Sequence, residues 1–139
     1  MAQRNRRVLI VEDNAMDSSL IAKMLRHGDS GFEVIHAARL SEAEQQLARS
    51  RFHVVISDLT LPDTQGLITF SRLKAAAGQS PIIVISGTDD EDLALTAVRE
   101  GAQDYLVKGR FEAHGLRRAI NYAIERHRIE TDHIHRAAR

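Results

Sequence analysis

The sequence predicts a single α/β domain of the doubly wound type, in which one parallel sheet of five strands is covered by helices on both faces. The chain has 139 residues, the length of one ordinary domain. Short aliphatic runs alternate along it with segments of helical periodicity, and this order favours right-handed crossovers between parallel strands. Three of the runs are apolar throughout, which is typical of strands buried on both faces.

Five runs are expected to form the strands. They occupy residues 8–11, 32–36, 54–56, 82–85 and 105–107. The first, third and fourth are the continuously apolar runs, and they are predicted to be central in the sheet. The second mixes polar and apolar residues, so we expect it nearer an edge.

The segments between the strands carry helix signals at their ends. Ser41 and Glu44 have the spacing of a capping box, which predicts the start of the second helix. Gly78 is expected to end the third helix and Gly101 the fourth. The acidic run 89–92 is expected to open the fourth helix, where negative charge complements the helix dipole.

The fifth helix is predicted to begin near Glu112 and to extend beyond the rest of the domain. Its apolar stripe consists of Leu116, Ala119, Ile120, Ala123 and Ile124. Residues 126–139 are mostly charged but remain compatible with a helix. They predict a projecting helical extension or a linker.

The composition excludes several classes of protein. The chain has no cysteine, so disulfides, thiolate metal sites and cysteine nucleophiles are absent. Nineteen basic residues balance nineteen acidic ones, whereas a nucleic-acid-binding domain usually has a basic excess. No apolar run is long enough for a membrane span or a signal-peptide core. We therefore expect a cytoplasmic domain that binds neither nucleic acid nor membrane.

Charged and hydroxyl side chains follow the strands at the points where the strands end. Glu12 and Asp13 follow the first run, Asp58 the third, Ser86 the fourth and Lys108 the fifth. In open parallel sheets the ligand site lies beyond the carboxyl ends of the strands. These side chains are therefore expected to converge at one edge of the sheet.

Such a site needs positive charge and suits phosphoryl transfer. Three carboxylates in one crevice repel one another, and Lys108 offsets only part of their charge. Mg²⁺ would supply the rest, because it binds through one or two carboxylates and shares phosphate oxygens. A carboxylate nucleophile, a cation, a lysine and a hydroxyl are together the parts that phosphoryl transfer requires.

The motifs at the strand ends resemble those of the receiver domain of bacterial two-component response regulators. They are Val11-Glu12-Asp13-Asn14, Asp58, Leu61-Pro62-Asp63 with Gly66, Ile85-Ser86-Gly87 and Asp104-Tyr105-Leu106-Val107-Lys108. The resemblance covers about residues 6 to 125, and residues 126–139 would then be the extension. It implies a flavodoxin-like (βα)5 domain with the strand order 2-1-3-4-5.

The resemblance implies a role for each matching position. Asp58 would be the phosphoacceptor, receiving its phosphoryl group from a phosphohistidine of a sensor histidine kinase or a histidine phosphotransfer protein. Ser86 and Lys108 would each contact a phosphoryl oxygen. Tyr105 resembles the aromatic switch residue of receivers, although an aromatic side chain on a half-buried strand is also typical of simple packing.

The resemblance also implies the Mg²⁺ ligands. Asp13, Asp58 and the backbone carbonyl of Thr60 would bind the ion directly, and Glu12 would reach it through water. The side chains of Thr60 and Thr88 lie where receivers tune the lifetime of the acyl phosphate, although both are also common loop residues. Gly109 departs from the family, which usually has proline after the lysine; the turn after Lys108 is therefore expected to be trans.

Other functions fit the sequence less well. A flavodoxin would need a Ser/Thr/Gly-rich loop after the first strand, where Glu12 and Asp13 stand instead. A haloacid-dehalogenase-type phosphatase would need a second acid at Thr60, so no turnover of an external substrate is expected. The main alternative is a receiver-like interaction module that signals without phosphorylation.

The output of the domain is left open by the sequence. The resemblance implies a downstream protein or a fused output domain as partner. Partner contact or self-association as a homodimer is expected at the face of the fourth helix, fifth strand and fifth helix. The projecting extension favours the leading piece of a longer protein over a stand-alone receiver.

Overall fold

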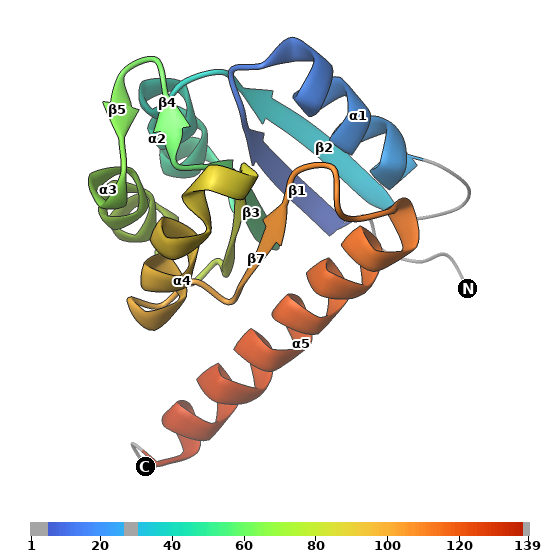
Figure 1. Cartoon of the computed structure of the whole chain (residues 1–139). Helices are drawn as coiled ribbons and strands as arrows, with labels where there is room; N and C mark the ends of the chain where they lie inside the picture. The colour runs from blue at the N-terminus through green and yellow to red at the C-terminus, as the bar shows by residue number, and fades with distance from the viewer. Residues whose placement is uncertain (1–5, 27–30, 138–139) are drawn as a thin grey trace.

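The computed structural model describes residues 6–26 and 31–137. Its main sheet consists of β1 (Arg6–Val11), β2 (Phe32–Ala37), β3 (Val54–Asp58), β6 (Ile82–Ser86) and β7 (Asp104–Val107). The strands are parallel and lie in the order β2-β1-β3-β6-β7 (Figure 1). When the five strands of this sheet are numbered along the chain, their order is 2-1-3-4-5, which confirms the predicted topology. The second strand, which mixes polar and apolar residues, lies at an edge as expected.

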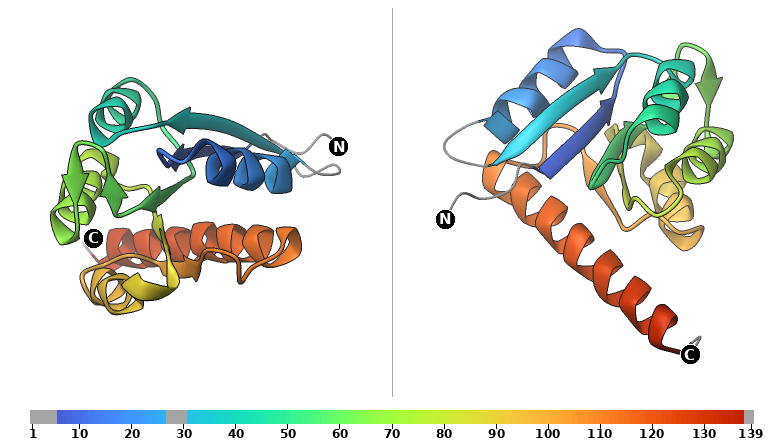
Figure 2. Two further views of the ribbon diagram at one scale, coloured as in Figure 1. Left: turned by 45° about the horizontal axis from the view of Figure 1, so that its top comes forward. Right: turned by 180° about the vertical axis from the view of Figure 1, so that it is seen from behind.

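Helices cover both faces of this sheet. They are α1 (Ala15–Arg26), α2 (Leu40–Arg49), α3 (Leu67–Ala77), α4 (Glu91–Arg99) and α5 (Ala113–Ala137), with a 3-10 turn η1 (Thr88–Asp90) before α4. The helices α1 and α5 pack on one face, and α2, α3 and α4 pack on the other (Figure 2). The helix stops predicted at Gly78 and Gly101 are confirmed to within a residue or two.

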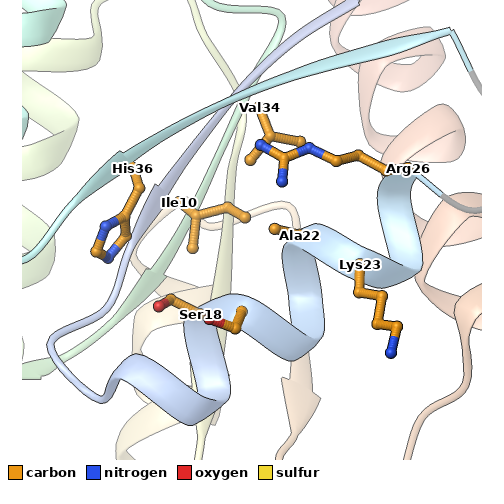
Figure 3. A pocket seen from close by; sticks show the side chains of 8 residues that line it. Ile10, Ser18, Ala22, Lys23, Arg26, Val34 and His36 are labelled. Carbon is orange, nitrogen blue, oxygen red and sulfur yellow. The ribbon is translucent and has the colours of Figure 1, made fainter.

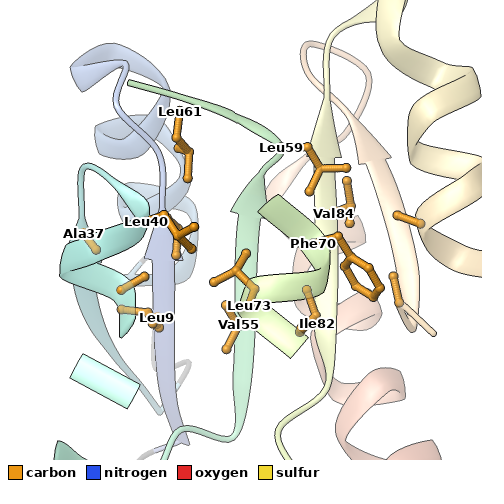
Figure 4. Close-up of a cluster of buried hydrophobic side chains, with 14 of the residues drawn as sticks. Leu9, Ala37, Leu40, Val55, Leu59, Leu61, Phe70, Leu73, Ile82 and Val84 are labelled. Carbon is orange, nitrogen blue, oxygen red and sulfur yellow. The ribbon is translucent and has the colours of Figure 1, made fainter. Parts of the chain in front are cut away.

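Alternate residues of the central strands supply two separate cores. Leu9, Val55 and Val84 point toward α2, α3 and α4, where Phe70 and Leu73 meet them (Figure 4). The intervening residues of the same strands face α1 and α5; among them are Val8, Ile10, Ile56, Ile83 and Ile85. Both faces of these strands are therefore buried, which is why their sequences are apolar without alternation.

The start of α2 differs from the predicted capping box. The helix begins at Leu40, ahead of Ser41, and its first two N–H groups donate to the carboxylate of Asp63 at 2.9 and 3.0 Å. Glu42 accepts from the N–H of Ala38 at 2.8 Å. The capping-box prediction was wrong because a carboxylate from a distant loop supplies the cap.

The segment after β3 forms a small hairpin that the sequence did not predict. Its antiparallel strands are β4 (Thr60–Leu61) and β5 (Thr64–Gln65). The hairpin is closed by the N–H of Gly66, which donates to the carbonyl of Leu59 at 2.9 Å. This turn places Asp63 over the start of α2.

The last helix continues well past the sheet. α5 extends to Ala137, and its second half projects away from the strands (Figure 1). Residues 138 and 139 of the expected extension lie outside the described residues. Within the described part of the chain, none of the helices is both long and apolar enough to span a membrane.

Candidate functional site

Lys108 brings the carboxylates together at the carboxyl edge of the sheet. Its Nζ lies 2.8 Å from Oδ2 of Asp58, 2.8 Å from Oε1 of Glu12 and 3.1 Å from Oδ2 of Asp17. The lysine is held at the end of β7 because its backbone N–H donates to the carbonyl of Ser86 at 2.8 Å. One ammonium group therefore contacts acids from three different segments and offsets part of their charge.

Asp58 has its two carboxylate oxygens in different environments. Oδ1 accepts a hydrogen bond from the backbone N–H of Thr60 at 3.0 Å, while Oδ2 accepts one from Lys108. The side chain is 13% exposed, so it is mostly shielded yet reachable from solvent. Both oxygens of the Asp58 carboxylate are therefore held in a defined orientation.

Glu12 is fully buried behind Asp58. Its Oε2 accepts from the N–H of Asn14 at 3.2 Å. Burial raises the pKa of Glu12, and the charge of Asp58 raises it further, although Lys108 and Asn14 oppose the shift. The hydrogen bonds that Lys108 donates outweigh its own desolvation, so the pKa of Lys108 is raised and the ammonium stays charged at neutral pH.

The pH dependence of stability follows from the buried Glu12. The pKa of Glu12 is higher in the folded chain than its ordinary value of 4.5 in the unfolded chain. Ionisation of Glu12 therefore costs the folded chain no stability at a pH below 4.5, and the cost grows as pH rises through the raised pKa. In Mg²⁺-free buffer we expect Glu12→Gln to be more stable than wild type at neutral pH. The difference should vanish as pH falls below the ordinary value.

Urea unfolding followed by circular dichroism across this pH range measures the effect. Glu112→Gln removes an exposed carboxylate and serves as the matched control, with no comparable trend expected. A Glu12→Gln variant that is less stable than wild type at neutral pH, and equally so in acid, would contradict the role of burial.

Ser86 contributes a hydroxyl that has no partner yet. The side chain is 4% exposed, and its Oγ makes no hydrogen bond to any of the described residues. Buried polar atoms are usually paired. This hydroxyl can therefore donate a hydrogen bond to an oxygen atom of a ligand at the edge of the site.

The remaining predicted site residues lie nearby but do not contact Lys108. Asp13 is exposed, directly after the buried Glu12. Thr60 in β4 and Thr88 in η1 are exposed, shortly after the ends of β3 and β6. Tyr105 is half-buried on β7 and packs against the core under α2, α3 and α4.

The donor atoms of this site suit a hard cation. The described residues include no group of three His, Cys, Asp or Glu side chains already arranged around a metal. The carboxylates of Glu12 and Asp58 nevertheless lie close together, since both contact Lys108, and Asp13 directly follows Glu12 in the sequence. Carboxylate oxygens are ligands that Mg²⁺ prefers. The residues present therefore fit Mg²⁺ by their chemistry.

The structure adds residues that sequence reasoning missed. Asp17, in the first turn of α1, contacts Lys108, and the only signal for it was an acid shortly after Glu12. His36 on β2 places Nε2 2.7 Å from the carbonyl oxygen of Glu12. Figure 3 shows His36 beside a separate groove of about 350 Å³ between β2 and α1, which does not include the acids.

Gly109 shapes the turn after Lys108. Its φ is +82°, and the described residues have no cis peptide bond, so the expected trans turn is confirmed. Proline could not occupy this turn, because its ring holds φ near −65°. Glycine at this position is therefore matched to the local backbone.

Comparison with known proteins agrees with this geometry. The family model of the response regulator receiver domain matches residues 8–121. The chain belongs to this family. The receiver domain is 30% identical over 118 residues to chemotaxis protein CheY of Bacillus subtilis, covering 83% of this chain and 94% of CheY. It is also 30% identical over 101 residues to the swarming motility regulation protein RssB of Serratia marcescens, covering 73% of this chain and 45% of RssB.

Solved structures show the same receiver fold. A response regulator receiver domain protein from Clostridium thermocellum has a TM-score of 0.78 and 28% identity, covering 89% of this chain and 98% of that chain. The receiver domain of the sensor histidine kinase PA1611 from Pseudomonas aeruginosa has a TM-score of 0.74 and 28% identity, covering 87% and 98%. In that structure a magnesium ion is coordinated in the active-site cleft.

Family membership establishes the general role. Receiver domains are signalling domains of two-component systems. The predicted family and fold class are therefore confirmed. The chain spans nearly the whole of CheY but less than half of RssB, so its relatives include longer proteins.

Proposed function

We propose that this receiver domain accepts a phosphoryl group on Asp58 from a phosphohistidine of a sensor histidine kinase or a histidine phosphotransfer protein. The observation that supports this most strongly is the contact of the Asp58 carboxylate with Lys108, beside the buried Glu12. An oxygen of Asp58 attacks phosphorus, a P–O bond forms, and the P–N bond to the histidine breaks. The imidazole nitrogen of the donor keeps the electron pair.

The proposal gives the neighbouring side chains distinct tasks. Lys108 already contacts Asp58 and would pair with a phosphoryl oxygen, while the unpartnered Ser86 hydroxyl would donate to another. The exposed Thr60 and Thr88 side chains border the site and would tune access of water to the acyl phosphate. None of these groups needs to transfer a proton to the phosphoryl group.

Mg²⁺ is the cofactor in this proposal. Asp13, Asp58 and the backbone carbonyl of Thr60 would hold it, with Glu12 acting through water. The ion would neutralise the oxygens of the phosphoryl group during transfer. Support comes from the oxygen donors of this site and from the magnesium ion in the related receiver of PA1611.

The test is phosphoryl uptake from acetyl phosphate, measured as intact mass. We expect one phosphoryl addition with Mg²⁺ and none when the ion is removed with EDTA. Asp13→Asn should weaken Mg²⁺ binding at least about tenfold in an NMR titration, because it removes a direct ligand. Asp89→Asn, a change of an exposed carboxylate at the same edge, should leave the affinity unaltered.

Two outcomes would count against the proposal. Equal Mg²⁺ affinity in the Asp13→Asn variant and in wild type would refute the assigned ligand. A protein that neither binds Mg²⁺ nor takes up phosphate would instead be a phosphorylation-independent interaction module.

The signal would leave through the face formed by α4, β7 and α5. Residues 6–125 would be the receiver and residues 126–139 an extension toward a downstream protein or a fused output domain. Leu95 on α4 and Tyr122 on α5 are exposed apolar side chains on these elements. They make the face suitable for a partner or for a homodimer.

A switch would link the site to this face. Movement of Ser86 toward a phosphoryl oxygen would free space for Tyr105, which is half-buried one strand away. We expect beryllofluoride, an acyl-phosphate mimic, to change hydrogen exchange across 88–99 and 105–124. A population shift of about 1–3 kcal/mol would give protection changes of several-fold to about a hundredfold. Changes confined to the surroundings of Asp58 would rule out this route.

A further inference from the structure

A second cavity lies at the end of the sheet opposite to Asp58. Its volume is about 560 Å³, within the range of small-molecule sites. His53 and Pro81 line it, and they directly precede β3 and β6, whereas Asp58 and Ser86 end the same strands. The cavity is therefore separated from the acidic site by the length of the central strands.

The second half of α5 forms one wall of this cavity. Ile124, His127 and Arg128 supply that wall. All three lie beyond residue 121, where the match to the receiver family ends. The cavity is thus built by the middle of α5, from Ile124 to Arg128, against the ends of α2 and α3.

The lining combines an apolar surface with positive charge. Phe52, Pro81 and Ile124 supply apolar contact. The ionisable residues that line the cavity are Arg51, His53, His127 and Arg128, with no carboxylate among the described lining residues, and Arg128 is paired at 2.8 Å with Glu125 on the same helix. The side chain of Arg51 is exposed at the rim. Such a surface is complementary to a ligand that has an apolar body and a negative charge.

Arg7 adds to the positive field beside the cavity and orients its wall. Its guanidinium lies 4.6 Å from the centre of the Phe52 ring and donates to the carbonyl of Arg51 at 3.1 Å. Its backbone N–H donates to Nδ1 of His53 at 2.9 Å. In the neutral ring Nε2 of His53 therefore carries the hydrogen and can donate to a ligand.

His127 provides a polar atom that lacks a partner. Its Nε2 is buried and makes no hydrogen bond to any of the described residues. Buried polar atoms are normally satisfied by protein, water or ligand. A lining residue in this state is an additional reason to expect a polar ligand atom in the cavity.

We propose that this cavity binds a small organic anion with an apolar body, through its apolar wall, the guanidinium of Arg51 and Nε2 of His127. The site is distinct from the phosphorylation site and does not depend on phosphoryl transfer.

Naphthalene-2-sulfonate is a suitable probe, and naphthalene-2-sulfonamide is its neutral counterpart of nearly the same shape. We expect the sulfonate to give saturable, single-site shifts in two-dimensional NMR spectra of the full chain, centred on residues 51–53, 79–81 and 124–128. The sulfonamide should bind roughly tenfold more weakly or worse, because it lacks the charge.

Two variants test the assigned side chains. Arg51→Glu should weaken sulfonate binding by roughly tenfold or more, whereas Arg49→Glu, an equal change of charge outside the cavity, should leave it unaltered. His127→Leu keeps an apolar wall but removes the unpartnered nitrogen, so it should weaken binding without lowering the melting temperature.

The proposal fails if the sulfonate shifts residues around Asp58 or in the groove between α1 and β2 instead. It also fails if the sulfonamide binds as tightly as the sulfonate, or if Arg51→Glu and Arg49→Glu have equal effects. Phosphorylation from acetyl phosphate, measured on the same variants, would remain intact in any of these cases if the proposed receiver function is correct.

Discussion

Asp58→Asn is expected to abolish phosphoryl uptake from acetyl phosphate completely. The carboxylate oxygen is the nucleophile, and an amide in its place cannot form the acyl phosphate. In wild type this carboxylate is oriented by the N–H of Thr60 and the ammonium of Lys108. Intact mass measured in the presence of Mg²⁺ should show one phosphoryl addition in wild type and none in the variant.

The matched control is Asp63→Asn. Asp63 is an exposed carboxylate in the loop after β3, and its oxygens accept from the first N–H groups of α2. Burial would raise its pKa slightly, but the N–H groups of Ser41 and Leu40 outweigh this and hold the pKa of Asp63 below its usual value. Asparagine is also a good cap, so the control should fold and be labelled like wild type. Labelling of Asp58→Asn at the wild-type level would show that another residue accepts the phosphoryl group.

Lys108→Met is expected to destabilise the fold in Mg²⁺-free buffer. The ammonium contacts Glu12, Asp58 and Asp17, and its loss leaves a buried carboxylate beside a mostly buried one. Breaking a fully buried ion pair costs about 3–5 kcal/mol, and Lys108 is 26% exposed, so we expect a loss of about 2–3 kcal/mol. Addition of Mg²⁺ should recover part of this loss, because the ion replaces the missing positive charge.

Urea unfolding at neutral pH, with and without Mg²⁺, measures both effects. Lys23→Met is the control, since Lys23 is an exposed lysine on α1 outside the acidic site, and its substitution should change stability by less than about 0.5 kcal/mol. A Lys108→Met variant that is as stable as this control would show that the ammonium does not compensate the acids. If Mg²⁺ leaves the loss of stability unchanged, the ion does not bind close enough to the acids to replace the positive charge of Lys108.

The sequence by itself determined the strands and the edge at which the acids gather, and the resemblance to receiver domains supplied the strand order. Continuous apolar runs such as those ending before Glu12 and Asp58 are buried on both faces, so their periodicity alone identified them. The carboxyl ends of parallel strands share one edge of the sheet, which brings Glu12, Asp58, Ser86 and Lys108 to the same side without further information. The family motifs then supplied the roles that spacing could not, and these roles remain proposals.

The tertiary structure alone decided which distant groups pair with one another. The cap of α2 comes from Asp63, and a local capping box had been predicted because cap signals in the sequence extend only a few residues. Asp17 contacts Lys108 because α1 begins directly after β1, at the carboxyl edge of the sheet. The cavity lined by His53 and His127 exists because α5 continues past the sheet and packs beside the amino ends of β3 and β6. These contacts depend on how separate elements cross in space, which local periodicity does not encode.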